Sequence, residues 1–171
     1  MMASPIAVIA GADTAAIQAL LQNAVTQWRA DGLTICGMIE ERDEVVEGRC
    51  SCGVLRNLTT NEGFPMYLDE PPAHTSCHID EVSVTHAGES VLDQIAQADI
   101  VVLSRFGKVE AAGSGLFHAF EAARAQGKPI ITSVAPKHDY QWQRFAPDAM
   151  LISPSQGKIR DWARSIAAPG S

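Results

Sequence analysis

Short apolar runs alternate along this chain with segments whose apolar residues recur at helical spacing, and this alternation constrains the fold most. Residues 5–11 read Pro-Ile-Ala-Val-Ile-Ala-Gly, which is typical of a strand buried on both faces of a sheet. Residues 14–29 have helical periodicity, and residues 33–41 form a second strand candidate. Because crossovers between parallel strands are right-handed and carry a helix, this opening predicts a βαβ unit.

The alternation is interrupted over about residues 42–85, where no helical period is found. Within this insert, residues 52–58 and 64–70 flank a turn-forming Thr-Asn-Glu-Gly, which predicts an antiparallel hairpin. Alternation then resumes with a helix at 88–98, a strand at 98–104, a helix at 114–126, a strand at 128–135, a short helix near 138–145, a strand at 149–153 and a helix at 155–167. We predict one α/β domain over residues 1–171, with three layers and a mostly parallel sheet.

Composition excludes several classes of protein. The 171 residues include 20 Asp and Glu against 13 Lys and Arg, a net charge of −7, which argues against a nucleic-acid or anionic-membrane binder. No apolar run approaches the roughly 20 residues of a membrane span, and the first residues lack a basic region. The 4 cysteines without a secretory signal are expected to be reduced thiols of a cytoplasmic protein. Composition leaves a homo-oligomer open.

The loop after the first strand stands where a phosphate-binding loop would lie. That loop requires G-x-x-x-x-G-K-[ST], whose glycines, lysine and hydroxyl contact phosphate and Mg²⁺. Counted from Gly11, the last three positions are Ala, Ile and Gln at 16–18, so the pattern is lost. An ordinary strand–helix turn is the simpler interpretation. Because a helix N-terminus still attracts anions, Gly11, Asp13 and Thr14 are kept as candidate ligand-binding residues.

The segment after the strand candidate at 98–104 carries the densest positive charge of the chain. Ligands of open parallel sheets bind beyond the carboxyl ends of the strands, so Arg105 and Lys108 lie where a ligand would enter. Arg105 offers a forked contact to an anion and Lys108 a point contact, and Glu110 would orient Lys108 or act on a bound water. The next helix is expected to begin with residues that offer unhindered N–H groups: Gly113, Ser114 and Gly115. The alternative is a capped helix start with solvated charges.

Cysteine and histidine gather in two clusters inside the insert: Cys50 and Cys52, then His74, Cys77 and His78. A tetrahedral zinc site needs four such ligands, but these spacings match no common zinc knuckle. We therefore predict unligated side chains and no metal site.

Residues 98–145 resemble a known bacterial family. The string Ser104-Arg-Phe-Gly-Lys-Val-Glu-Ala-Ala-Gly-Ser-Gly115, the later Gly-Lys-Pro-Ile-Ile-Thr-Ser-Val and Trp142-x-x-Phe145 are similar to the family called domain of unknown function 2478. Cys77-x-x-Asp80 belongs to the same resemblance, which makes Cys77 and Asp80 candidate ligand-binding residues. The family has no established activity. The association of some members with molybdate-handling gene clusters implies molybdate or a pterin-type molybdenum cofactor as a ligand.

The same layout resembles the thermophile nucleoside-triphosphatase family, which implies a phosphate-loop-hydrolase-like fold with helices on both faces of the sheet. Where that family has D-E-x-G-K-x-E, this chain reads Ser104-Arg-Phe-Gly-Lys-Val-Glu110, so Gly107, Lys108 and Glu110 match. The acidic pair that would serve Mg²⁺ and the attacking water is replaced by Ser104 and Arg105, so bound Mg²⁺ is not expected.

These observations predict a non-hydrolysing protein that binds a small anion or phosphorylated ligand on a degenerate nucleotide-hydrolase scaffold. One alternative is a divergent nucleoside triphosphatase or phosphotransferase, in which Lys108 and Glu110 would be catalytic. The other is a metal-binding regulatory protein that uses the cysteines and histidines of the insert.

Overall fold

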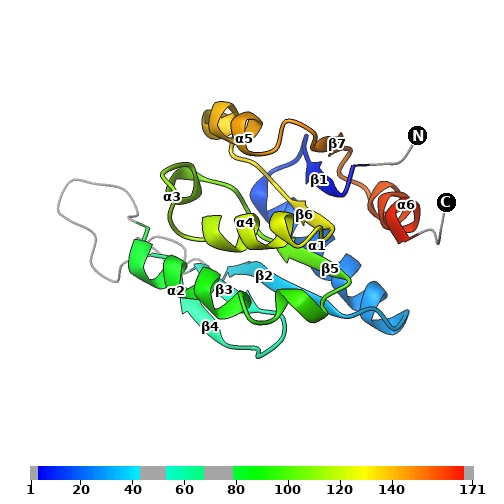
Figure 1. The fold of residues 1–171 in the computed structure, drawn as a ribbon, viewed down its shortest axis with the longest axis horizontal. Helices are drawn as coiled ribbons and strands as arrows, with labels where there is room; N and C mark the ends of the chain where they lie inside the picture. Colours follow the sequence, from blue (N-terminus) through cyan, green and yellow to red (C-terminus); the bar gives the residue numbers. More distant parts are fainter. Residues whose placement is uncertain (1–3, 43–52, 68–78, 168–171) are drawn as a thin grey trace.

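The computed structural model describes residues 4–42, 53–67 and 79–167 of the chain, and its centre is one mixed sheet (Figure 1). The strands are β1 (Ile6–Ile9), β2 (Ile35–Arg42), β3 (Gly53–Asn57), β4 (Gly63–Pro65), β5 (Ile100–Leu103), β6 (Ile130–Thr132) and β7 (Met150–Ile152). Their order is β4-β3-β2-β5-β6-β1-β7. The five strands from β2 to β7 in this order are parallel, and β3 and β4 are antiparallel additions.

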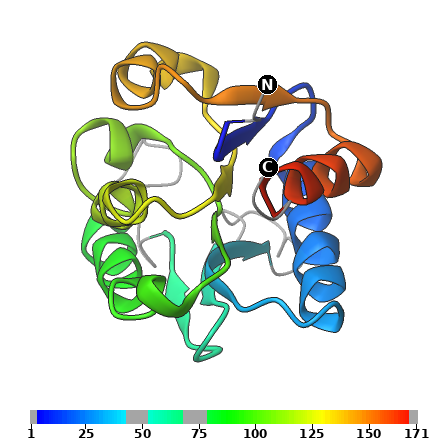
Figure 2. The ribbon, with the colours of Figure 1, turned by 45° about the vertical axis from the view of Figure 1, so that its right-hand side comes forward.

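Helices cover both faces of this sheet. They are α1 (Thr14–Ala30), α2 (Glu81–Val91), α3 (Lys108–Ala111), α4 (Phe117–Ala125), α5 (Asp139–Phe145) and α6 (Gln156–Ala167), with short 3₁₀ turns η1 (Ile95–Gln97) and η2 (Pro136–His138). Figure 2 shows α1 (blue) and α6 (red) on one side of the sheet and α2 (green) and α4 (yellow) on the other. The predicted three-layer α/β fold is confirmed. No helix of the described ranges is both long and apolar enough to cross a bilayer.

The central strands are apolar throughout because they separate two cores. In β1, Ile6 and Val8 pack into the core beneath α2 and α4, whereas Ala7 and Ile9 pack beneath α1 and α6. Successive side chains of a strand point to opposite faces, so a strand covered on both sides has no polar face. This is why the run at 5–11 contains no alternation of polar and apolar residues.

The insert joins the sheet as a hairpin beside β2. Met38 to Arg42 of β2 pair with β3, and Val54 to Arg56 of β3 pair with β4, both in antiparallel register. The Asn57 side chain accepts hydrogen bonds from the N–H groups of Thr59 (2.8 Å) and Thr60 (3.0 Å) and so holds the turn. The predicted hairpin is confirmed, although its second strand is shorter than the predicted 64–70.

Two predicted helix positions are wrong. The helix expected at 88–98 is α2, which begins at Glu81 because Asp80 caps it and accepts a 3.0 Å hydrogen bond from the Ser83 N–H. The helix expected from residue 114 is α4, which begins at Phe117. Gly113 and Gly115 before it have φ of 87° and 62°, which a right-handed helix does not accommodate.

Gly37 allows β2 to approach β5, the strand that leads into the site described below. Its φ is +127°, and a Cβ atom there would lie 1.7 Å from the Val102 carbonyl oxygen. We expect Gly37→Ala to lower the free energy of unfolding by about 3 kcal/mol or more, or to prevent folding, because strand backbones would have to separate.

Gly32→Ala is the matched control, since Gly32 also has a positive φ (+89°) but no atom within 4 Å of the added Cβ. It should cost only the left-handed backbone strain, about 1–2 kcal/mol. Urea unfolding followed by tryptophan fluorescence measures both. Equal losses in the two variants would show that the β2–β5 approach is not what Gly37 protects.

Candidate functional site

A cavity of about 390 Å³ lies at the edge of the sheet where β5 and β6 end. Arg105 and Lys108 line it from the segment after β5, and Lys137 and His138 line it from η2, which follows β6. Residues of the β3–β4 hairpin and of α2 complete the walls. The carboxyl ends of parallel strands are where open α/β sheets bind their ligands, so this cavity is the candidate site.

Hydrogen bonds beyond the strands hold the two cationic segments together. The Ser104 carbonyl accepts hydrogen bonds from Gln18 Nε2 (3.0 Å) and from Ser133 Oγ (2.9 Å). Phe106 donates its N–H to the Ser133 carbonyl (2.7 Å) and accepts from the Ala135 N–H (3.0 Å). The backbone on both sides of Arg105 is therefore fixed to the end of β6, which sets the position from which Arg105 extends.

A buried carboxylate closes the loop between Arg105 and α4. Glu110 is 6% exposed. Its Oε1 accepts from the Gly107 N–H (2.9 Å) and its Oε2 from the Leu116 N–H (3.0 Å). Burial raises the pKa of the Glu110 carboxyl above its usual value, while the two N–H donors and the charge of Arg105 act in the opposite direction. Both oxygens thus accept hydrogen bonds within the loop, and Glu110 also contributes to the lining of the cavity.

Gly115 is the residue that makes room for this carboxylate. A Cβ atom at Gly115 would lie 2.3 Å from Glu110 Oε2, and its φ of +62° also favours glycine. The glycine is therefore required by an internal contact as well as by its backbone conformation.

The three small residues at 113–115 do not offer free N–H groups, so that prediction is wrong. Each N–H already has an acceptor in the chain: for Gly113 the Glu110 carbonyl, for Ser114 the Val109 carbonyl and for Gly115 the Thr85 hydroxyl. Ser114 lies on a separate depression against α2, which it shares with Glu81 and Glu89.

The turn at 11–14 carries the N-cap of α1 and lies away from the cavity. Asp13 caps α1 by accepting a 2.8 Å hydrogen bond from the Ala16 N–H. Gln18, which stands where a phosphate-binding loop has Ser or Thr, is buried and joins the Ser104 carbonyl to the Glu40 N–H. Gly11, Asp13 and Thr14 do not line the cavity that contains Arg105, and β6 separates β1 from β5 in the sheet.

Lys137 and His138 are missing from the sequence-based prediction. Both follow the strand candidate at 128–135, so the strand-end rule that points to Arg105 points to them as well. Within the described ranges no carboxylate forms an ion pair with Arg105, Lys108 or Lys137. The lining of the cavity therefore contains three cationic side chains and one carboxyl group, that of Glu110, although the chain as a whole carries −7.

The remaining predicted residues lie elsewhere. Asp80 is the cap of α2 and does not line the cavity. The possible metal ligands of the insert lie outside the described residues: Cys50, Cys52, His74, Cys77 and His78. In the part of the chain that the structure describes, no group of His, Cys, Asp and Glu is arranged to hold a metal ion.

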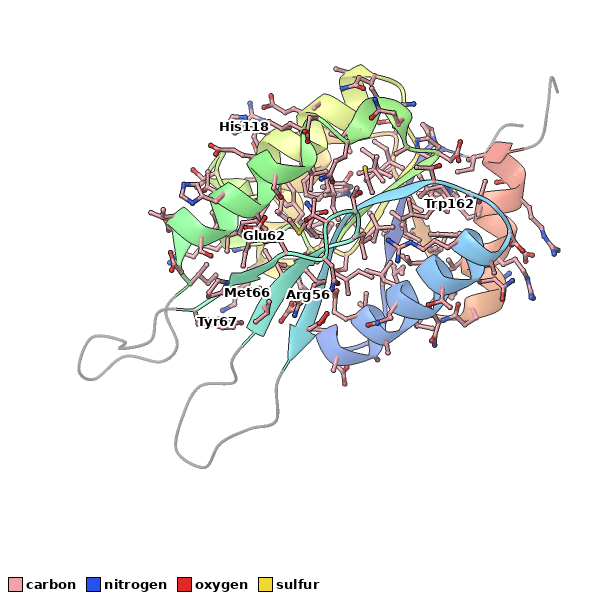
Figure 3. The ribbon with its side chains drawn as sticks, turned by 90° about the horizontal axis from the view of Figure 1, so that it is seen from below. Arg56, Glu62, Met66, Tyr67, His118 and Trp162 are labelled. Atoms are coloured by element: carbon pink, nitrogen blue, oxygen red, sulfur yellow. The ribbon has the colours of Figure 1, made fainter. Side chains whose placement is uncertain are left out.

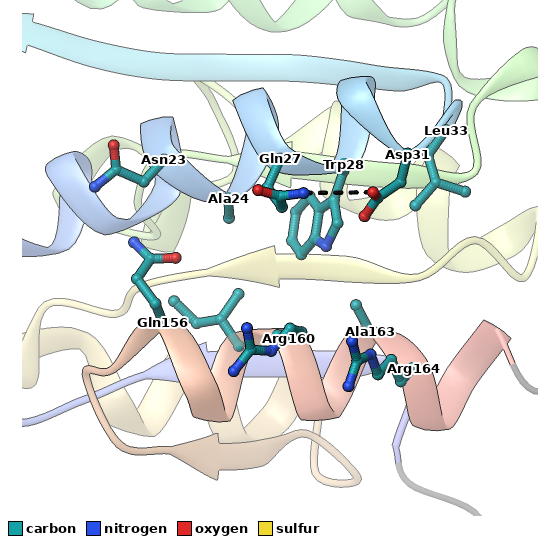
Figure 4. A pocket seen from close by; sticks show the side chains of 11 residues that line it. Asn23, Ala24, Gln27, Trp28, Asp31, Leu33, Gln156, Arg160, Ala163 and Arg164 are labelled. Carbon is teal, nitrogen blue, oxygen red and sulfur yellow. Dashed lines mark hydrogen bonds between the residues drawn. The ribbon is translucent and has the colours of Figure 1, made fainter.

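A second cavity of about 530 Å³ lies between α1 and α6 (Figure 4). Its floor includes Trp28 and Ile159, which are core residues, and Arg160 and Arg164 stand on the α6 side. It is lined by helix residues and the α1–β2 turn and holds no residue from a carboxyl end of β5 or β6. For this reason we assign the candidate site to the smaller cavity.

Comparisons with known proteins identify relatives of the chain but not a function. The family described as "Protein of unknown function (DUF2478)" matches residues 6–162. "Molybdenum import ATP-binding protein ModC 2" of Bradyrhizobium diazoefficiens is 37% identical over 71 residues, which cover 41% of this chain and 8% of that protein. "Bifunctional protein HldE" of the same species is 38% identical over 79 residues, 46% of this chain and 15% of that protein. The chain thus spans a small part of either relative, and no solved structure matches it.

The contacts of Glu110 lead to a stability prediction. In Glu110→Gln, one of the two backbone N–H groups faces an amide NH₂ in place of an oxygen and loses its acceptor. We expect a decrease of about 1–3 kcal/mol in the free energy of unfolding at neutral pH, measured by urea denaturation. Glu121→Gln is the control, because the Glu121 side chain is 52% exposed, and it should stay within about 0.5 kcal/mol of wild type. A Glu110→Gln variant as stable as the control would contradict the assigned role.

Proposed function

This chain belongs to the DUF2478 family of proteins of unknown function, and we propose that it binds a small anion or phosphorylated ligand without hydrolysing it. The observation that carries the proposal is the group of positive side chains around one cavity, Arg105, Lys108 and Lys137, with His138 beside them. With Glu110 as the one carboxylate among the cavity's charged lining residues, the lining carries an excess of positive charge, which favours a negatively charged ligand.

The chemistry of these side chains suits phosphate-like groups. A guanidinium presents a planar fork that matches two oxygens of an oxyanion, and an ammonium acts as a point charge. Arg105 is partly buried, whereas Lys108 and Lys137 are exposed. The contact of Arg105 would therefore be less screened by water than those of the two lysines, and we assign to Arg105 the main share of the affinity.

Several features favour binding over catalysis. The lysine and hydroxyl positions of a phosphate-binding loop are held by Ile17, which is in the core, and by Gln18, which joins backbone groups. Glu110, the best candidate for a general base, uses both carboxylate oxygens on backbone N–H groups. A divergent nucleoside triphosphatase or phosphotransferase would have to release this carboxylate before it could act on water.

Molybdate deserves a place among the anions to be tested. One partial relative is named "Molybdenum import ATP-binding protein ModC 2", and molybdate is a tetrahedral oxyanion like phosphate and sulfate. A molybdenum cofactor that carries a phosphate would present the same kind of group to Arg105. Molybdate and a molybdenum cofactor are therefore included among the ligands that we propose for this cavity.

We expect Arg105→Ala to weaken anion binding by about 10- to 150-fold, because a charge-assisted hydrogen bond contributes roughly 1.5–3 kcal/mol. Arg105→Lys should recover part of this loss, since the charge returns without the fork. Isothermal titration calorimetry with phosphate, sulfate and molybdate measures the affinities. Arg160→Ala, in the cavity between α1 and α6, is the matched control and should bind as wild type does. Absence of binding below millimolar concentration, or an equal loss in Arg160→Ala, would overturn the proposal.

Nucleotide hydrolysis is expected to be negligible. ATP and GTP with Mg²⁺ should show no turnover in a phosphate-release assay, because removal of each transition-state contact costs about 100- to 1,000-fold in rate and several are missing. Turnover in the usual range of about 1–1,000 per second that Lys108→Ala abolishes would instead support the enzymatic alternative.

A further inference from the structure

We infer that the ligand of this cavity is an organic phosphate whose phosphate is attached to a flat apolar ring, and not a bare oxyanion. The inference rests on the proposed function and specifies its ligand. It follows from the division of the cavity into a cationic part, Arg105, Lys108 and Lys137, and an apolar part formed by the hairpin and its surroundings.

The two parts come from different strands of the sheet. The cations follow β5 and β6, whereas Leu55 lies on β3 and Met66 directly follows β4. In the sheet order these elements lie on opposite sides of β2. A ligand that contacts both parts therefore needs a charged end and an apolar end.

The size of the cavity supports the same ligand. A volume of about 390 Å³ is within the range of roughly 300–1,000 Å³ typical of sites for small organic molecules. A tetrahedral oxyanion would fill only a few water volumes of about 30 Å³ each and would leave the apolar wall in contact with water. The ring supplies the surface that covers this wall.

The apolar wall still has surface to bury. Met66, Tyr67 and Ile79 line the cavity and are only partly buried, unlike Leu55, which is 1% exposed. Figure 3 shows Met66 and Tyr67 together at the end of β4.

Backbone contacts hold this wall in place. Met66 donates its N–H to the Gly53 carbonyl (2.9 Å) and accepts from the Asp80 N–H (2.7 Å), and Tyr67 pairs with Ile79. A fixed methionine and tyrosine suit a flat ring, because the thioether and the phenol ring both make favourable contacts with aromatic groups.

The experiment compares three probes by calorimetry: inorganic phosphate, phenyl phosphate and phenol. Phenyl phosphate should bind about 10- to 100-fold more tightly than phosphate, because the ring buries apolar surface, and phenol should bind more weakly than phenyl phosphate. Arg105→Ala should weaken both phosphates. Met66→Ala should weaken phenyl phosphate by about 3- to 10-fold and leave phosphate within twofold.

Met66 also packs against the core, so Tyr67→Ala provides a second variant of the wall with the same expected pattern. Leu151→Ala, at a side chain on β7 that is 71% exposed, is the control and should bind all probes as wild type does.

Equal affinity for phosphate and phenyl phosphate, with both reduced by Arg105→Ala, would overturn this inference and leave the proposed function standing. Phenol binding as tightly as phenyl phosphate would also overturn it. If neither inorganic phosphate nor phenyl phosphate binds, the proposed function itself is overturned.

Discussion

The contact between the Glu110 carboxylate and the N–H groups of Gly107 and Leu116 organises the cationic edge of the sheet. A buried carboxylate is costly unless donors surround it, and here each oxygen has its own backbone donor. The loop therefore closes around α3 and carries Lys108 on its outer side. Arg105 stands next to this negative charge but also lines the cavity. The buried Glu110 carboxyl thus fixes the loop that carries Arg105 and Lys108 to the edge of the sheet.

Internal hydrogen bonds also occupy donors at the two helix starts that the sequence analysis proposes for a ligand. Asp13 accepts a hydrogen bond from the Ala16 N–H at the start of α1, and the N–H groups at 113–115 are bonded to the chain itself. Whether such donors are free depends on side chains and turns that meet only after folding. Charged residues that follow neighbouring strands do come together, because strand ends are fixed by the sheet: Arg105 and Lys108 follow β5, the lysine and histidine of η2 follow β6, and all four line one cavity.

Most of the fold could be predicted from local sequence, since strands covered on both faces must be apolar and the hairpin turn has its own residue types. The start of α2 lies within the range predicted as insert. Its apolar residues Val84, Ala87 and Val91 recur at helical spacing, but the residues just before Asp80 have a composition typical of loops and hide where the helix begins. The start of α4 is set by the left-handed conformations of Gly113 and Gly115, and at Gly115 the packing of Glu110 leaves no room for a side chain. The apolar side of the cavity depends on how the hairpin lies against α2, and no local pattern encodes it.

The hairpin is an antiparallel addition to the parallel sheet, so the walls of the cavity come from two kinds of strand pairing. β3 and β4 lie outside the five parallel strands, whereas the cationic residues follow two of those strands, β5 and β6. The hairpin is nevertheless tied to the hydrophobic core, because Leu55 of β3 belongs to that core and Met66 packs against it. A substitution at Met66 therefore alters the packing of the core as well as the wall of the cavity, so the two cannot change independently there.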